Sequence, residues 1–135
     1  MSEQNKAVVR EYYARVINGR DLDAVGEFFV DERMVEGVKS GCFRYFEAFP
    51  DMHVALDDLI AEDDRVFLRS TLTGTHDGEY KGVPATSRHV ATECAEVFRV
   101  VDGRFAGYWC LTNVAGLMRQ LTEEPALEAV STTAS

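Results

Sequence analysis

Two different spacings of apolar residues divide the chain, and their order constrains the fold more than any other feature of the sequence. Up to about residue 49, apolar side chains recur every three or four positions, as on one face of a helix. From residue 52 to residue 113 they mostly alternate with polar ones, as in strands with one buried face. Helices followed by consecutive strands predict an α+β fold, with a curved, mostly antiparallel sheet wrapped around three N-terminal helices. A pocket between these layers is a natural site for a small molecule.

The boundaries of the predicted elements follow from turn and cap residues. The three helices are expected at residues 4–18, 22–29 and 39–49, with residues 33–36 extended. Strands are expected at residues 52–57, 65–76, 88–101 and 104–113, and a short helix at 114–121. Residues 77–87 contain Gly and Pro and predict a loop. We therefore expect one domain over residues 1–121, followed by a disordered tail over residues 122–135.

Composition excludes several classes of protein. The net charge is −9 and the isoelectric point is about 4.7, which argues against binding to nucleic acid. No apolar run is long enough for a signal peptide or a membrane span, which predicts a cytoplasmic protein without a membrane partner. The three cysteines are far apart in the sequence and predict free thiols. The acidic clusters lack the spacing of a metal site, so no metal is expected.

Four segments carry a resemblance to a known family: NGRDLDAVGEFF, AFPDMHVALDDLIAEDDRV, LTGTHDGEYKGVPATSRHV and VFRVVDGRFAGYW. With them, the chain resembles the SnoaL-like polyketide cyclases of the nuclear transport factor 2-like superfamily over nearly its whole length to Leu121. The resemblance implies a cone-shaped α+β barrel. It also implies ring closure of an aromatic, polyketide-like small molecule by acid–base residues in the cone, without a cofactor. Relatives are linked to polyketide hydroxylation and to epoxide-opening ring closure.

The sequence departs from the family pattern at two places. The segment DERMVEGVKSGCF is short and lacks the longer loop, often with a histidine, of many relatives. The family also implies an aspartate on the last strand, and this position aligns with Cys110, or with Asn113 if the alignment is offset. Asparagine does not titrate, and a buried thiol is normally protonated. The acid or base must therefore come from another residue.

The hairpin around Asp102-Gly103 decides which residues share a face with that position. A three-residue loop over residues 101–103 would place Glu96 opposite Tyr108 and group it with Cys94, Phe98 and Cys110. The other face would carry apolar side chains: Ala95, Val97, Phe105, Trp109 and Leu111. A two-residue turn would instead place Glu96 beside Trp109. We prefer the three-residue loop because it separates polar from apolar residues.

Glu96 is then the only carboxylate on the mixed face and the first candidate for a catalytic residue. Burial would raise its pKa toward neutrality, which suits proton transfer. Tyr45, His53 and His76 are further candidates, which would polarise a substrate oxygen. The candidate substrate-binding residues are Tyr13, Phe49, Cys94, Phe98, Tyr108, Trp109, Cys110 and Asn113.

Each candidate also has a structural interpretation. Glu96 could be a solvated strand residue or an ion-pair partner, and both histidines could face solvent. The two strand cysteines, Cys94 and Cys110, are favoured as small buried hydrophobes. Trp109 is favoured as a core or interface residue, because an uncovered apolar sheet face predicts at least a homodimer. The functional alternatives are a cofactor-free cyclase, a non-catalytic protein that binds natural products, and a relative associated with hydroxylation.

Overall fold

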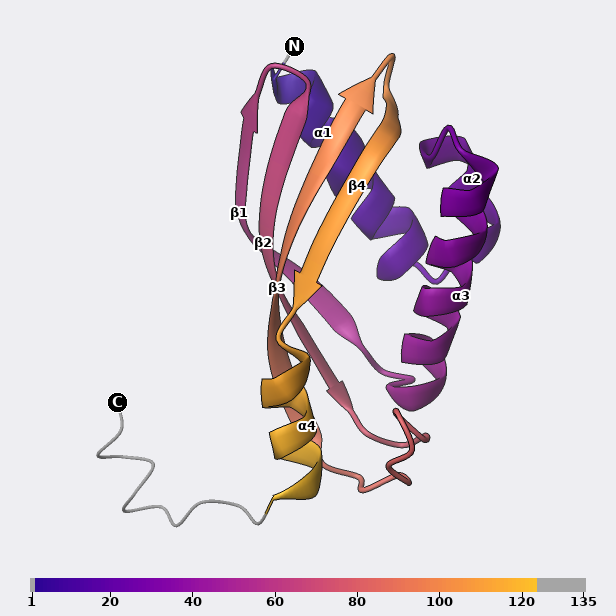
Figure 1. Ribbon diagram of the computed structural model, residues 1–135, viewed down its shortest axis with the longest axis vertical. Helices are drawn as coiled ribbons and strands as arrows, with labels where there is room; N and C mark the ends of the chain where they lie inside the picture. The colour runs from indigo at the N-terminus through magenta and orange to yellow at the C-terminus, as the bar shows by residue number, and fades with distance from the viewer. Residues whose placement is uncertain (1, 124–135) are drawn as a thin grey trace, which may run out of the picture.

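The computed structural model describes residues 2–123, which form an antiparallel sheet covered on one side by helices (Figure 1). The chain runs through α1 (Ser2–Tyr12), helical turns at Tyr13–Ile17 and Leu22–Ala24, α2 (Val25–Phe28), α3 (Glu32–Ala48), β1 (His53–Glu62), β2 (Arg65–Thr75), β3 (His89–Val101), β4 (Arg104–Thr112) and α4 (Val114–Thr122). The four strands are neighbours in chain order. This arrangement confirms the predicted α+β class and the cone-shaped fold. Most of the expected tail, residues 124–135, lies outside the described residues.

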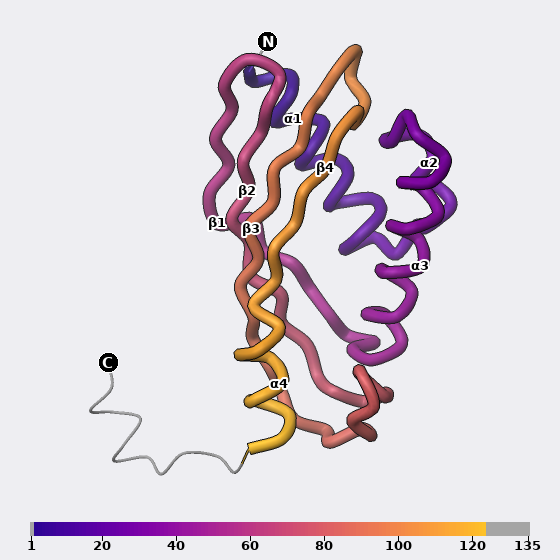
Figure 2. The backbone as a smooth tube through the Cα atoms, viewed as in Figure 1, coloured from indigo at the N-terminus to yellow at the C-terminus, as the bar shows by residue number. Residues whose placement is uncertain are grey.

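The sheet is curved, and the N-terminal end of β1 and the C-terminal end of β2 bend toward the C-terminal end of α3 (Figure 2). The helix α1 packs against β1 and β2 and closes one side of the cone. Its C-terminal end and α2 contribute Tyr12, Phe28 and Phe29 to an aromatic cluster with Phe98 and Phe105. This cluster fills the core beside the hairpin of β3 and β4. Among the described residues, no helix is long and apolar enough to cross a membrane.

The third helix is longer than the sequence predicts. Residues 33–36, expected to be extended, belong to the 17-residue helix α3. The helix begins early because the Asp31 carboxylate accepts a hydrogen bond from the backbone N–H of Arg33 at 2.7 Å, which caps its first turn. Gly37 and Gly41 interrupt the apolar pattern within this helix, so its periodicity is weak in the sequence.

The preferred register of the hairpin is wrong. Asp102 and Gly103 have φ values of 52° and 76°, and Val101 pairs directly with Arg104, so the turn has two residues. The register then shifts by one residue between Arg99 and Val100. This β-bulge changes the face of every later residue on β4.

The turn and the bulge together shift the pairing by two residues from the prediction. Glu96 therefore lies opposite Cys110 instead of Tyr108, but these residues keep the predicted common face. Phe105 lies before the bulge and is fully buried in the core, so its predicted place on the outer apolar face is also wrong. The bulge thus keeps both Phe105 and Tyr108 on the inner side of the sheet.

Candidate functional site

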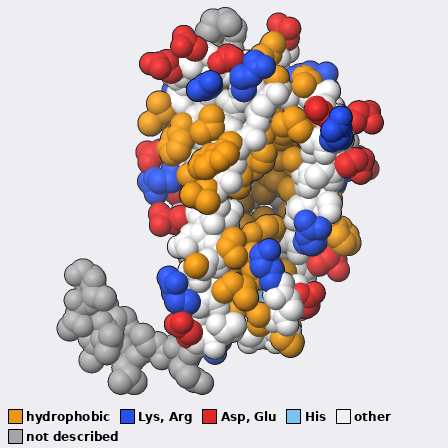
Figure 3. Space-filling model, viewed as in Figure 1, with side chains coloured by type: hydrophobic (Ala, Val, Ile, Leu, Met, Phe, Trp, Pro, Cys, Tyr) orange, Lys and Arg blue, Asp and Glu red, His pale blue; other side chains and the backbone are white. Residues whose placement is uncertain are grey.

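A cavity of about 450 Å³ lies between α3 and the inner face of the sheet. Figure 3 shows it as a hollow between β4 and α3, surrounded by hydrophobic side chains. Its lining comes from α1, α3 and all four strands: Tyr12, Tyr13, Ile17, Met34, Gly37, Val38, Gly41, Cys42, Tyr45, Met52, Val54, Ser70, Leu72, Cys94, Glu96, Tyr108, Cys110 and Thr112. The volume lies in the range of sites for small organic ligands.

One face of α3 forms a wall of the cavity. The lining residues recur every three or four positions along the helix: Met34, Gly37, Val38, Gly41, Cys42 and Tyr45. A Cβ atom added at Gly37 or Gly41 would meet nothing within 4 Å. The two glycines therefore leave open space along the middle of this wall, where larger side chains would fill it.

The opposite wall is a row of small side chains across the sheet. Ser70 on β2 pairs with Cys94 on β3, which pairs with Thr112 on β4. The Cys94 thiol donates a hydrogen bond to the Thr112 hydroxyl at 3.6 Å. Glu96 and Cys110 form the next inward-facing pair on β3 and β4. The middle of the cavity thus lies between two walls of short side chains.

Glu96 is the only carboxylate among the cavity-lining residues, and only 5% of it is exposed. Burial raises its pKa from 4.5 to about 7, although the hydroxyls of Tyr13 and Tyr108 act in the opposite direction. The Tyr13 hydroxyl donates a hydrogen bond to Glu96 Oε2. Burial also raises the pKa of Tyr13 well above its usual value, so this hydroxyl keeps its proton. The site therefore holds one carboxyl that titrates near neutral pH beside a permanent donor.

The three thiols on the cavity wall are poor nucleophiles. Burial raises the pKa of Cys42 and of Cys94 to about 11. It also raises the pKa of Cys110, one of the two positions at which the resemblance implies an aspartate. A protonated thiol neither attacks a carbonyl nor removes a proton at neutral pH. Of the acid–base groups in the cavity, Glu96 is the one suited to proton transfer near neutrality.

A second polar group in the cavity is the hydroxyl of Tyr45, on the last turns of α3. It lies 3.2 Å from the hydroxyl of Tyr80, which comes from the loop between β2 and β3. Tyr45 also stacks on the ring of Phe49, with the centroids 6.3 Å apart. Burial is the main cause that raises the pKa of Tyr45, so it too remains a hydrogen-bond donor.

The structure thus brings six of the sequence candidates together around the cavity: Tyr13, Tyr45, Cys94, Glu96, Tyr108 and Cys110. The other six lie elsewhere. His53 is exposed at the start of β1. His76 is fully buried, and its Nδ1 accepts a hydrogen bond from the backbone N–H of Thr86 at 3.2 Å, so its side chain holds the following loop. Neither histidine lines the cavity.

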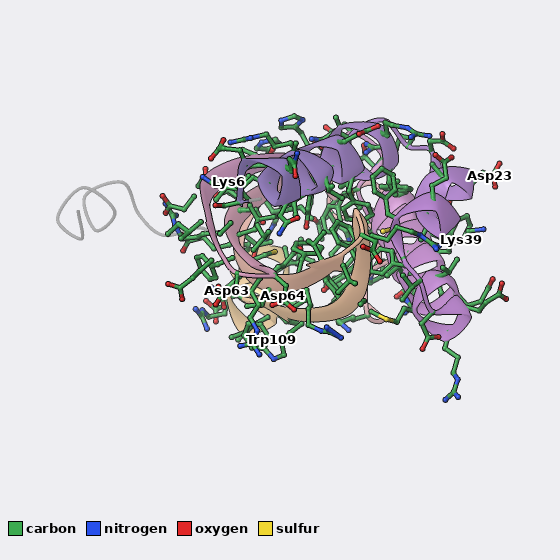
Figure 4. All side chains as sticks on the ribbon, turned by 90° about the horizontal axis from the view of Figure 1, so that it is seen from above. Lys6, Asp23, Lys39, Asp63, Asp64 and Trp109 are labelled. Atoms are coloured by element: carbon green, nitrogen blue, oxygen red, sulfur yellow. The ribbon has the colours of Figure 1, made fainter. Side chains whose placement is uncertain are left out.

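The remaining four candidates have structural positions. Phe49 and Phe98 are fully buried in the core. Asn113 caps α4, because its side-chain Oδ1 accepts a hydrogen bond from the backbone N–H of Gly116 at 3.0 Å. Trp109 lies on the side of the sheet opposite α1 and is 53% exposed (Figure 4). Alternation along β4 turns its side chain away from the cavity.

Sequence reasoning missed most of the wall that α3 provides. Met34 lies in the segment 33–36 that was predicted to be extended, and Val38 lies just before the predicted start of the helix at residue 39. Gly37 and Gly41 have no side chain that would add to an apolar pattern. A helical spacing of Met34, Val38, Cys42 and Tyr45 is present in the sequence and could have revealed the wall. Tyr80 carries no such signal, because its position depends on how the loop folds back.

The profile of the SnoaL-like polyketide cyclases matches residues 7–121. The chain belongs to the SnoaL-like polyketide cyclase family. The match confirms the resemblance in the sequence and includes every residue of the cavity wall. The family accounts for a cavity built for a small, polyketide-like molecule. A search of curated protein sequences finds no significant match.

Several solved structures share the fold over most of the chain. AclR from Streptomyces galilaeus, a candidate hydroxylase, is 29% identical with a TM-score of 0.81, and the match covers 99% of this chain and 90% of AclR. TsrD from Streptomyces laurentii is 26% identical with a TM-score of 0.79, and the match covers 90% of this chain and 97% of TsrD. IdmH from Streptomyces antibioticus, a candidate polyketide cyclase, is 25% identical with a TM-score of 0.77, and the match covers 87% of this chain and 98% of IdmH.

Proposed function

We propose that this protein closes a ring in an aromatic, polyketide-like molecule by acid–base catalysis, with Glu96 as the general base. The buried carboxyl in a mostly apolar cavity, where it is the only carboxylate among the lining residues, is the observation that carries this proposal. Its pKa of about 7 leaves a substantial fraction ionised at neutral pH, yet makes it a stronger base than an exposed glutamate. Membership of the cyclase family supports the reaction class.

In the aldol form of the reaction, the Glu96 carboxylate removes a proton from a carbon next to a substrate carbonyl. That carbon then forms the new C–C bond with a second carbonyl carbon of the same molecule. Negative charge develops on the second carbonyl oxygen, where the hydroxyl of Tyr45 can donate a hydrogen bond. Transfer of the proton from Glu96 to this oxygen completes the alcohol and restores the base.

The same groups suit an epoxide-opening closure. Glu96 would remove the proton of an attacking hydroxyl while a tyrosine hydroxyl donates to the epoxide oxygen. A new C–O bond forms as one epoxide C–O bond breaks, and the proton moves to the released oxygen. Both reactions conserve the atoms of the substrate, so each gives a product of unchanged mass.

Hydroxylation is the second candidate, and the 29% identity to AclR favours it. This reaction adds one oxygen atom and needs molecular oxygen and a reductant. Mass spectrometry of the product therefore separates it from ring closure.

The test uses a synthetic aromatic diketone that can close a six-membered ring by intramolecular aldol addition. We expect Glu96→Gln to lower the rate of ring closure by at least about a hundredfold, the low end of the contribution of a general base. Glu93→Gln is the matched control, because Glu93 lies on the same strand with a side chain that is 68% exposed. Full activity of Glu96→Gln would refute the role of Glu96. Tight binding without conversion by the wild type would favour a non-catalytic binding protein.

We also propose that the protein works as a homodimer through the outer face of the sheet. A row of apolar side chains crosses all four strands there, in the pairing order Ile60, Phe67, Val97 and Trp109. Ile60 is 61% exposed and Trp109 is 53% exposed. Leu111, two residues beyond Trp109 on the same face, is 61% exposed. A continuous apolar surface of this kind is typical of an interface.

A further inference from the structure

The hydroxyls of Tyr45 and Tyr80 lie 3.2 Å apart, and either of them could be the donor of the hydrogen bond between them. Tyr80 is 6% exposed and does not line the cavity, and Tyr45 is its only side-chain hydrogen-bond partner within residues 2–123. If Tyr45 donated to Tyr80, the Tyr80 proton would have no protein acceptor among residues 2–123, in a residue that is only 6% exposed. A buried donor without a partner costs about 1–3 kcal/mol. If Tyr80 donates to Tyr45, the Tyr80 proton has the Tyr45 oxygen as its acceptor, and the Tyr45 proton can be donated into the cavity.

The second arrangement leaves the Tyr45 proton free. Because Tyr45 lines the cavity, that proton can point toward a bound molecule. One lone pair of the Tyr45 oxygen then accepts the proton of Tyr80, and the O–H of Tyr45 remains to be donated to the ligand. A donor of this kind selects a hydrogen-bond acceptor, such as a carbonyl oxygen.

The loop between β2 and β3 is fixed in the position that this contact needs. The backbone N–H groups of Asp77 and Gly78 both donate to the carbonyl of Ala48, the last residue of α3, at 3.0 and 3.1 Å. A side chain at Gly78 would place its Cβ 2.0 Å from the carbonyl oxygen of Glu47, so only glycine permits this approach. Tyr80 and Val83 then exchange two backbone hydrogen bonds of 3.0 and 2.9 Å. The loop is thereby held against the end of the helix that carries Tyr45.

We propose that Tyr80 is a positioning residue, which orients the hydroxyl of Tyr45 as a donor to a carbonyl oxygen of the substrate. This inference rests on the proposed role of the cavity as the substrate site. It deepens that role, because it assigns a function to a loop outside the cavity. It also specifies two features of the ligand: a ketone-type oxygen that accepts from Tyr45, and an acidic proton that Glu96 removes.

The test compares two planar tricyclic probes that differ in one group. 9-Fluorenone carries a carbonyl oxygen, and fluorene has nearly the same shape without it. Binding of each is measured by equilibrium dialysis to the full chain. We expect the wild type to bind fluorenone about tenfold more tightly, as one net hydrogen bond allows. Tyr45→Phe should remove this preference.

Tyr80→Phe keeps the ring and its packing but loses the proton that orients Tyr45. We expect it to reduce the preference for fluorenone to about threefold or less, with fluorene binding unchanged. Adding Tyr80→Phe to Tyr45→Phe should cause no further loss, because both act through one contact. Equal loss for both probes, an unchanged preference in Tyr80→Phe, or no preference in the wild type would each overturn the proposal. Full ring closure by Glu96→Gln would instead overturn the proposed function and leave this preference intact.

Discussion

Glu96 carries its carboxyl group where water hardly reaches, and this position links function to stability. Its folded-state pKa of about 7 lies above the ordinary value of 4.5. Between these two values the folded state holds a proton that the unfolded state has lost. The contribution of Glu96 to the free energy of unfolding is therefore fully present below about pH 4.5 and is lost as the pH rises through 7.

Substitution of Glu96 isolates this effect. Since one pKa unit corresponds to about 1.4 kcal/mol, the rise from 4.5 to about 7 implies a loss of about 3 kcal/mol. The free energy of unfolding of the wild type, relative to Glu96→Gln, should fall by about this amount between about pH 4 and pH 8. Urea denaturation of both variants across this range measures it. A constant difference between the two would show that Glu96 titrates normally.

At the scale of single residues, the sequence identified the chemistry better than the positions. Alternation along β3 placed Glu96 on the same face as Cys94, and the structure confirms that shared face. The histidines could not be placed, because the burial of His76 depends on contacts with Thr86 in a folded-back loop. Asn113 was predicted to bind substrate, but its side chain accepts a hydrogen bond from the backbone N–H of Gly116 and caps α4.

At the scale of elements, α3 determines the shape of the cavity. Gly41 faces the cavity, and the space beside it is open. Gly41→Ala should favour the helix by up to about 1 kcal/mol, yet weaken binding of 9-fluorenone because the new methyl group enters the cavity. Gly26→Ala in α2 is the control, since a Cβ there also meets nothing within 4 Å but lies outside the cavity. Thermal unfolding and dialysis give the two readouts, and unchanged fluorenone binding by Gly41→Ala would contradict the assignment of this wall.

The elements also show where sequence patterns fail. The strands β2 and β3 agree with their predicted ranges to within one residue, because long alternating runs identify strands well. The two-residue turn, rather than the predicted three-residue loop, places Phe105 in the core. The bulge between Arg99 and Val100 has no clear pattern of its own, and it returns Tyr108 to the inner face. The early start of α3 depends on one cap, Asp31, whose effect competes with two glycines downstream.

At the scale of the whole molecule, the apolar row on the outer sheet face predicts assembly. Trp109→Lys places a charge in the proposed interface, where burial of an unpaired charge is costly. Light scattering should give twice the 15.1 kDa mass of the chain for the wild type and a single-chain mass for this variant. Phe43→Lys is the control, because Phe43 is 55% exposed on α3, away from the sheet. A monomeric wild type would contradict the proposed dimer.

The pH dependence of ring closure tests the central claim most directly. Glu96 must be ionised to act as a base, so the rate with the synthetic diketone should rise with pH and level off above an inflection near 7. The small residual rate of Glu96→Gln should lack this inflection. A profile without an inflection near 7 in the wild type, or the same inflection in Glu96→Gln, would contradict the assignment of proton transfer to Glu96.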